Sequence, residues 1–140
     1  MSSDMAKRRR RESRKGSAMV EFSLVFLLVF TVIYALMEFS RFVYCYNVLA
    51  GATREASRYA MVHGSKSGAP ATPSDIQAQV ERWGIGLNAS ALTVTTTWPN
   101  GNAPKNSVRV ESTYTLTPFT NLIIPSTLTI GSRSEMLISQ

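Results

Sequence analysis

A run of sixteen residues without a formal charge, at positions 22–37, constrains this chain more than any other feature. As an α-helix it would span roughly 24 Å, whereas the hydrocarbon core of a bilayer is roughly 30 Å thick. Extending the helix back to Ser17 brings its length to roughly 31 Å. The extension places Glu21 inside the apolar segment. We therefore predict a membrane-spanning helix that carries a carboxylate near one end.

A charge inside a membrane helix is costly, so Glu21 needs a partner. At the helix centre the cost is roughly 2.5–3.5 kcal/mol on insertion scales, and it is less near the interface. Residues of this kind usually have a function. The nearest basic residues are Arg14 and Lys15. If residues 1–16 are removed, the α-amine of Ser17, in the same chain or in a neighbouring copy, becomes the nearest cation.

The positive charge of the chain lies almost entirely before the apolar run. The net charge is +6, of which residues 1–16 contribute +5 and the remainder +1. By the positive-inside rule, the N-terminus is expected in the cytoplasm and the C-terminal part outside it. A nucleic-acid surface on the folded part is excluded, because it would need clustered basic residues there. Arg8–Arg11 could form a nucleic-acid arm, but the adjacent membrane helix explains these arginines better.

The apolar run could also belong to a cleaved secretory signal peptide or to an uncleaved signal anchor. The run is longer than the roughly 7–15 apolar residues of a secretory signal peptide. The Ala-x-Ala pattern at residues 50–52 lies about fifteen residues beyond the run, too far for signal cleavage. The main alternative is an uncleaved, signal-anchored bitopic protein with a small extracytoplasmic binding domain, whose basic residues only set the topology.

The helical pattern continues beyond the apolar run, and we expect one helix from about Ser17 to His63, ended by Gly64. Glu38 and Arg41 are spaced i, i+3 and can meet on one face. A stripe of small side chains recurs every four residues, at Ala52, Ala56 and Ala60. The stripe either lets a helix or a sheet approach closely or reflects helix propensity alone.

The remaining residues predict a short helix and a small sheet. Thr72-Pro73-Ser74-Asp75 matches a capping box with proline at the first helical position. The following helix places three apolar side chains on one face and ends at Gly84; these side chains are Ile76, Val80 and Trp83. Apolar residues alternate at 92–98 and at 108–116, and those at 128–130 and 136–138 flank a polar stretch.

The predicted fold class is α+β. Three short strands and one short helix bury little surface by themselves. We therefore expect the second half of the long helix to pack against the short helix and an antiparallel sheet of three to four strands, in meander order around the loop Pro118–Pro125.

No residue pattern indicates an enzyme, a metal site or a cofactor. Cys45 is the single cysteine, and its apolar neighbours predict a small packed side chain. His63 is the single histidine and is expected to be an ordinary residue of a loop or helix end.

Residues 15–22, Lys-Gly-Ser-Ala-Met-Val-Glu-Phe, resemble the processing site of a type IVb (Flp/Tad) prepilin. That pattern is a basic leader, a glycine, four residues, a glutamate and an aromatic residue. The runs Glu-Phe-Ser-Arg at 38–41 and Ala-Thr-Arg-Glu-Ala-Ser-Arg-Tyr-Ala at 52–60 look like the TadE-like family of minor pilins, and favour TadE over the related TadF. The resemblance covers residues 15–62, and the β region matches only in general character.

The resemblance implies that a prepilin peptidase cleaves between Gly16 and Ser17. Glu21 would then stand at mature position five and pair with a Ser17 amine, and the apolar helices would bundle. The residues expected to take part in helix packing are Phe22, Glu38, Arg41, Ala52, Ala56 and Ala60. Because residue 17 is Ser where many type IVa pilins have Phe, N-methylation is not carried over.

The implied organisation is a cleaved leader at 1–16, a helix at 17–63 that is transmembrane to about residue 38, and an extracytoplasmic head at 64–140. The implied protein is a non-enzymatic minor pilin, or pseudopilin, that takes part in pilus assembly and adhesion. Its partners would be the prepilin peptidase, other minor pilins, the major Flp pilin, the inner-membrane Tad assembly platform and the lipid bilayer. It would reside in the bacterial inner membrane with a periplasmic C-terminus, and reach the cell surface on assembly.

Overall fold

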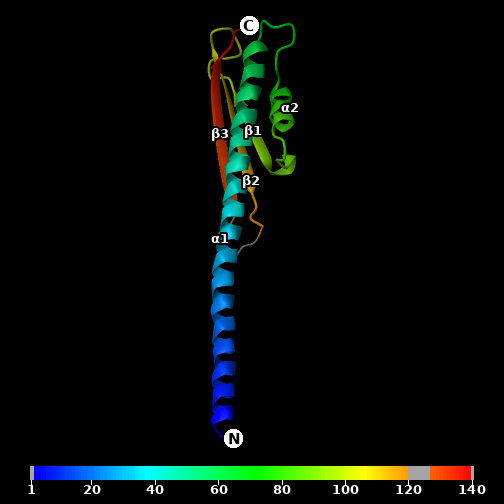
Figure 1. Cartoon of the computed structure of the whole chain (residues 1–140). Coiled ribbons are helices and arrows are strands. Elements are labelled where there is room, and N and C mark those ends of the chain that lie inside the picture. The colour runs from blue at the N-terminus through cyan, green and yellow to red at the C-terminus, as the bar shows by residue number, and fades with distance from the viewer. Residues whose placement is uncertain (1, 120–126, 140) are drawn as a thin grey trace. The chain divides into compact units, whose positions relative to one another are not determined.

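A computed structural model describes residues 2–119 and 127–139, with side chains from residue 16 onward. Residues 120–125 of the predicted loop Pro118–Pro125 lie outside the described residues. The elements in chain order are α1 (Ser2–Val62), α2 (Pro73–Trp83), the 3-10 helix η1 (Ala89–Ala91), β1 (Leu92–Thr97), β2 (Ser107–Leu116) and β3 (Leu128–Leu137) (Figure 1). The α+β fold class is confirmed, and α1 also includes residues 2–16.

The chain divides into two compact units, which we call the N-terminal unit (residues 1–39) and the C-terminal unit (residues 40–140). In the N-terminal unit, α1 exposes nearly all of its large apolar side chains; Phe22 is 70% exposed and Leu28 is 65% exposed. The hydroxyls of Ser23 and Thr31 donate hydrogen bonds to the carbonyls of Met19 and Leu27, each at 2.8 Å. The helix thus satisfies these hydroxyls internally, as a nonpolar surrounding requires.

The C-terminal unit contains a three-stranded antiparallel sheet in the order β1-β2-β3, the predicted meander. Its inner face buries a row formed by Leu92, Tyr114 and Ile130, which are partners in the strand register. β3 is one continuous strand of ten residues, so the sheet has three of the three to four strands that were expected. Its serines at 132 and 134 face inward and are half-buried, which hid the alternation in the sequence.

The second part of α1 belongs to the C-terminal unit and supplies small side chains to its core. Leu49 is fully buried there, and Thr53 and Ser57 on the same helix are also fully buried. The Thr53 hydroxyl donates to the Leu49 carbonyl at 2.7 Å, and the Ser57 hydroxyl donates to the Thr53 carbonyl at 2.9 Å. Because both hydroxyls are satisfied within the helix, they can be buried at little cost.

α2 begins with the predicted capping box. The Asp75 N–H donates to the Thr72 hydroxyl oxygen, and the Thr72 N–H donates to the Asp75 carboxylate at 2.9 Å. Ile76 and Val80 are fully buried, as predicted. Trp83 does not share their environment, because it is 50% exposed in the last turn, just before Gly84 ends the helix.

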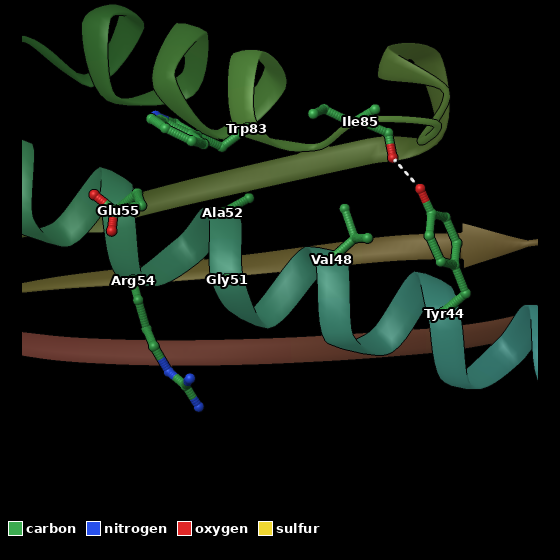
Figure 2. A pocket seen from close by; sticks show the side chains of 8 residues that line it. All are labelled: Tyr44, Val48, Gly51, Ala52, Arg54, Glu55, Trp83 and Ile85. Carbon is green, nitrogen blue, oxygen red and sulfur yellow. Dashed lines mark hydrogen bonds between the residues drawn. The ribbon is translucent and has the colours of Figure 1, made fainter.

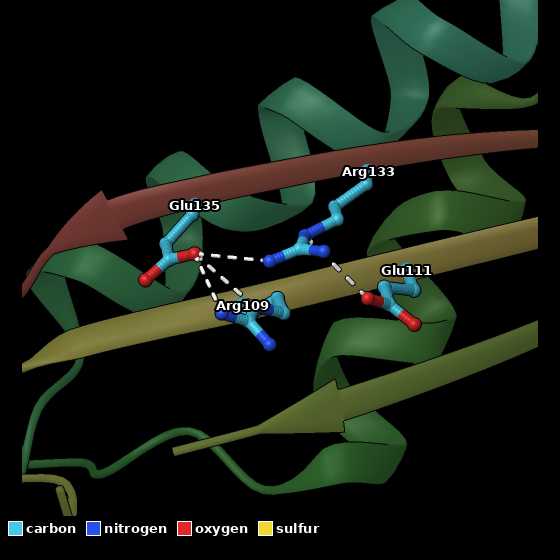
Figure 3. Close-up of polar contacts among 4 residues, drawn as sticks. All are labelled: Arg109, Glu111, Arg133 and Glu135. Atoms are coloured by element: carbon cyan, nitrogen blue, oxygen red, sulfur yellow. Dashed lines mark hydrogen bonds and ion pairs between the residues drawn. The ribbon is translucent and has the colours of Figure 1, made fainter. Parts of the chain in front are cut away.

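The outer face of the sheet carries a ladder of charges, shown in Figure 3. Arg109 pairs with Glu135 at 3.1 Å, and Arg133 reaches both Glu111 and Glu135 at 3.5 Å. The pairs of Arg109 with Glu135 and of Arg133 with Glu111 join β2 to β3, whereas the pair of Arg133 with Glu135 lies within β3. On its other side β3 has no strand partner in the described sheet, so it forms an open edge.

Two contacts fix the direction of β3 relative to the second part of α1. The Arg41 guanidinium donates to the carbonyl of Thr117, which follows β2, at 3.0 Å. After β3, the Ser139 N–H donates to the Met61 carbonyl at 3.0 Å. Because β3 begins at the Arg41 end and finishes at the Met61 end, it runs in the same direction as this part of α1.

Candidate functional site

The predicted cleavage segment lies on a regular, exposed stretch of α1. Gly16, Ser17 and Glu21 are all exposed. A Cβ atom built on Gly16 meets nothing within 4 Å, so no fold contact requires glycine at this position. Ser17 and Glu21 are four residues apart on a helix and therefore share one face.

Three phenylalanines form a ladder on the apolar part of α1 that the sequence analysis did not identify. The rings of Phe22 and Phe26 stack with centroids 6.1 Å apart, and those of Phe26 and Phe30 with centroids 6.2 Å apart. All three side chains are exposed. Their i, i+4 spacing is the sequence signal for such a ladder. Phe22, expected in helix packing, is thus the first ring of an aromatic stripe.

The other residues expected in helix packing occupy different environments. Ala52, Ala56 and Ala60 are buried in the core of the C-terminal unit, with 1% exposure or less. Glu38, the residue that ends the apolar run, retains 5% exposure.

Arg41 contacts the residues that directly follow β2, and the spacing of residues in the sequence does not predict this contact. Besides its bond to the Thr117 carbonyl, its guanidinium lies over the Phe119 ring, 4.4 Å from the centroid. Arg41 and Thr117 are separated by 76 positions in the chain. Phe119 itself is 63% exposed.

A groove of about 450 Å³ lies between α1 and the end of α2 (Figure 2). The Tyr44 hydroxyl crosses it and donates to the Ile85 carbonyl at 3.1 Å. Trp83 covers the other end, beside Ala52 and Glu55. The groove explains the half-exposed Trp83, because the indole rests against α1 on one side only.

The single cysteine and the single histidine of the chain occupy ordinary structural positions. Cys45 is buried, and burial raises the pKa of its thiol. His63 stacks on Tyr59 with centroids 4.0 Å apart, and its Nδ1 lies 2.9 Å from the Tyr59 carbonyl. Within residues 2–119 and 127–139, acidic, His and Cys side chains do not gather into a group that could hold a metal ion.

The fold defines a class of protein first. Part of α1 is long and apolar enough to cross a membrane, with a mean hydropathy of 2.3 in its most apolar window. Together with the α+β C-terminal unit, this describes a single-pass membrane protein. The model of the TadE-like protein family matches residues 16–58, so this part of the chain is similar to that family. Searches of curated proteins and of solved structures gave no match.

Proposed function

We propose that this chain is a minor pilin, or pseudopilin, that a prepilin peptidase processes between Gly16 and Ser17 and that takes part in assembling Flp/Tad pili. The observation that carries the proposal is where the family match lies. It begins at Gly16 and extends to residue 58. It therefore includes the glycine, Glu21, the apolar helix and most of the alanine stripe.

The geometry of α1 supports the processing step. Gly16 is exposed, and its backbone has no side chain that would keep an enzyme away. Cleavage after Gly16 removes a segment with charge +5 and creates an α-amine on Ser17. That amine starts the helix face that carries Glu21. Pairing with it, in the same chain or in a neighbour, would neutralise a carboxylate in lipid.

Processing is tested by co-expression with a prepilin peptidase and mass spectrometry of the N-terminus. The expected mature chain begins at Ser17. Gly16→Leu should leave the longer precursor, because a bulky side chain then precedes the scissile bond. Gly51→Leu is the matched control: Gly51 is also an exposed helical glycine with open space around its Cβ position, and this variant should be cleaved normally.

An intact leader in the wild-type chain under these conditions would support the alternative, an uncleaved signal-anchored protein with a small binding domain. Normal cleavage of Gly16→Leu would show that the scissile bond lies elsewhere.

The role of Glu21 is tested separately, because it concerns assembly rather than cleavage. Glu21→Ala should be processed but should weaken co-purification with other pilus subunits and reduce piliation. Glu55→Ala provides the control, since Glu55 is a glutamate of the same helix that pairs with Arg58 at 3.2 Å in the C-terminal unit. Normal piliation by Glu21→Ala would contradict the charge-pairing role.

A further inference from the structure

Charged side chains are unevenly distributed over the C-terminal unit. Residues 42–53 and 112–132 contain no charged residue. On the outer face of the sheet, the row of Thr97, Arg109 and Glu135 is charged, whereas the row of Thr93, Thr113 and Gly131 is not. The uncharged row lies toward the end of the unit where Arg41 holds the Thr117 carbonyl. One end of the unit is therefore charge-free except for Arg41.

We call this region the uncharged end. It consists of Arg41 and residues 42–46 of α1, the segment 84–92, residues 113–119, and residues 128–131 at the start of β3. Two interactions that connect these segments are the bond from the Tyr44 hydroxyl to the Ile85 carbonyl and the strand register between Tyr114 and Ile130. The bond from Arg41 to the Thr117 carbonyl and the bond from the Asn88 N–H to the Tyr114 hydroxyl bring these segments together at one end of the unit.

Exposed aromatic rings occupy this surface. Phe119 is 63% exposed, Tyr44 is 50% exposed and Tyr46 is 49% exposed. Aromatic side chains gather at the level of lipid headgroups, where an apolar ring can sit beside polar groups. A guanidinium stacked on a ring fits the same layer, because it can reach lipid phosphates while its stem remains among apolar groups.

The position of Arg41 in the chain decides between a lipid and a protein partner for this surface. The apolar run ends at residue 37, and Arg41 is the first basic residue after it. Four helical residues correspond to roughly 6 Å, which is within the interfacial layer of a bilayer that takes up the run. The surface is therefore continuous in sequence with the segment that would cross the membrane.

We propose that the uncharged end contacts the headgroup layer of the bilayer that α1 crosses, with Phe119 in the interface and Arg41 facing lipid phosphates. This inference rests on the membrane-spanning helix of the proposed function but not on cleavage of the leader. The contact would attach the chain to the bilayer at two points, through the membrane-spanning helix and through Phe119 with Arg41.

The test places a fluorophore on the full chain in lipid nanodiscs that contain anionic lipid. Thr117→Cys, in a Cys45→Ala background, carries the probe next to Phe119 while leaving that ring in place. Lys66→Cys is the matched control. Lys66 is exposed and follows the end of α1, and that end, at Val62, lies roughly 31 Å along the helix from Arg41. Val29→Cys, inside the apolar run, reports insertion.

Lipids with a nitroxide on the headgroup should quench the probe at residue 117 and leave the probe at residue 66 unquenched. Phe119→Ser and Arg41→Ala should each reduce the quenching at residue 117. Arg54→Ala should not, because Arg54 is an exposed arginine of the same helix outside the uncharged end.

Equal quenching of the probes at residues 117 and 66 by the headgroup nitroxide would overturn the proposal, whether both probes are quenched or neither is. If a nitroxide in the acyl chains still quenches residue 29, the membrane-spanning helix stands and only the second contact is wrong. If residue 29 is not quenched, the membrane-spanning helix is wrong as well. Cleavage between Gly16 and Ser17 is measured independently, so its failure would not be confused with either outcome.

Discussion

The two parts of α1 have the same backbone conformation but opposite side-chain arrangements. In the N-terminal unit the large apolar residues point outward, as Phe22 and Leu28 do. In the C-terminal unit the buried positions hold small residues such as Ala52 and Ala56, and only Leu49 is large. One helix thus has its apolar surface turned to its surroundings along one part and to a sheet along the other.

The difference shows that residue size, more than hydrophobicity, distinguishes the two surroundings. Lipid chains adapt to any side-chain shape, so a membrane segment can carry Phe and Leu on all sides. A sheet at a fixed distance admits only small side chains at the closest positions. Substitutions of the same chemistry in the two parts should therefore have different consequences for the C-terminal unit.

Removing a large apolar side chain should show the largest contrast. Leu49→Ala is expected to destabilise the C-terminal unit by about 2–5 kcal/mol, because it leaves a cavity at a fully buried site. Leu28→Ala, at a site that is 65% exposed, should leave the stability of that unit unchanged. Urea denaturation followed by tryptophan fluorescence measures both, and equal midpoints for the two variants would remove the contrast.

Enlarging a small side chain should show the next largest contrast. Ala56→Leu is expected to cost about 1–3 kcal/mol, since Ala56 is fully buried and the added atoms must displace the sheet. Ala18→Leu makes the same change at an exposed position of the N-terminal unit and should have no effect on the same denaturation midpoint. A tolerated Ala56→Leu would mean that the alanine stripe reflects helix propensity and not close packing.

The capping box tests whether α2 contributes to the stability of the C-terminal unit as a whole. Thr72→Ala should cost about 1 kcal/mol, because it removes the side chain that caps the helix. Thr95→Ala, an exposed threonine of β1, is the control for loss of a hydroxyl. An unchanged midpoint for Thr72→Ala would show that α2 unfolds without affecting the rest of the unit.

The same cap predicts a pH dependence. The hydrogen bond from the Thr72 side chain holds the pKa of Asp75 below its ordinary value. A carboxyl whose pKa is lowered on folding stabilises the fold above its unfolded pKa, and that contribution is lost as the pH falls through the folded pKa. The difference in denaturation midpoint between wild type and Thr72→Ala should therefore become smaller as the pH falls. A difference in midpoint that grows in acid would contradict this assignment.

The charge ladder should produce the smallest effect. Hydrogen bonds from Ser107 and then Arg109 lower the pKa of Glu135, but the pair lies on an exposed face. Glu135→Gln should therefore shift the denaturation midpoint slightly at low salt, and still less at high salt. A shift as large as that of Leu49→Ala would show that the outer face of the sheet matters more than its core.

Local patterns predicted most of the fold, and non-local contacts account for what they missed. The capping box at Thr72 located the start of α2, and alternation located β1 and β2. The number of strands was left at three to four because inward-facing serines interrupt the apolar pattern of β3. Trp83 follows the spacing of Ile76 and Val80, but it lies where α2 ends.

The candidate site also combines a local pattern, which the sequence predicted, with a non-local contact, which it did not. Ser17 and Glu21 are four residues apart in the sequence, so their shared helix face followed from spacing alone. The contact between Arg41 and Phe119 joins positions far apart in the chain, and only the folded structure brings them together.

The open edge of β3 has a consequence for how copies of this chain can associate. Unpaired strand edges invite pairing with another molecule, and charged side chains such as Arg133 and Glu135 only partly discourage it. Since β3 runs in the same direction as the second part of α1, antiparallel pairing of two such edges would point the two helices in opposite directions. A pair formed in this way would therefore place its two Arg41 residues at opposite ends.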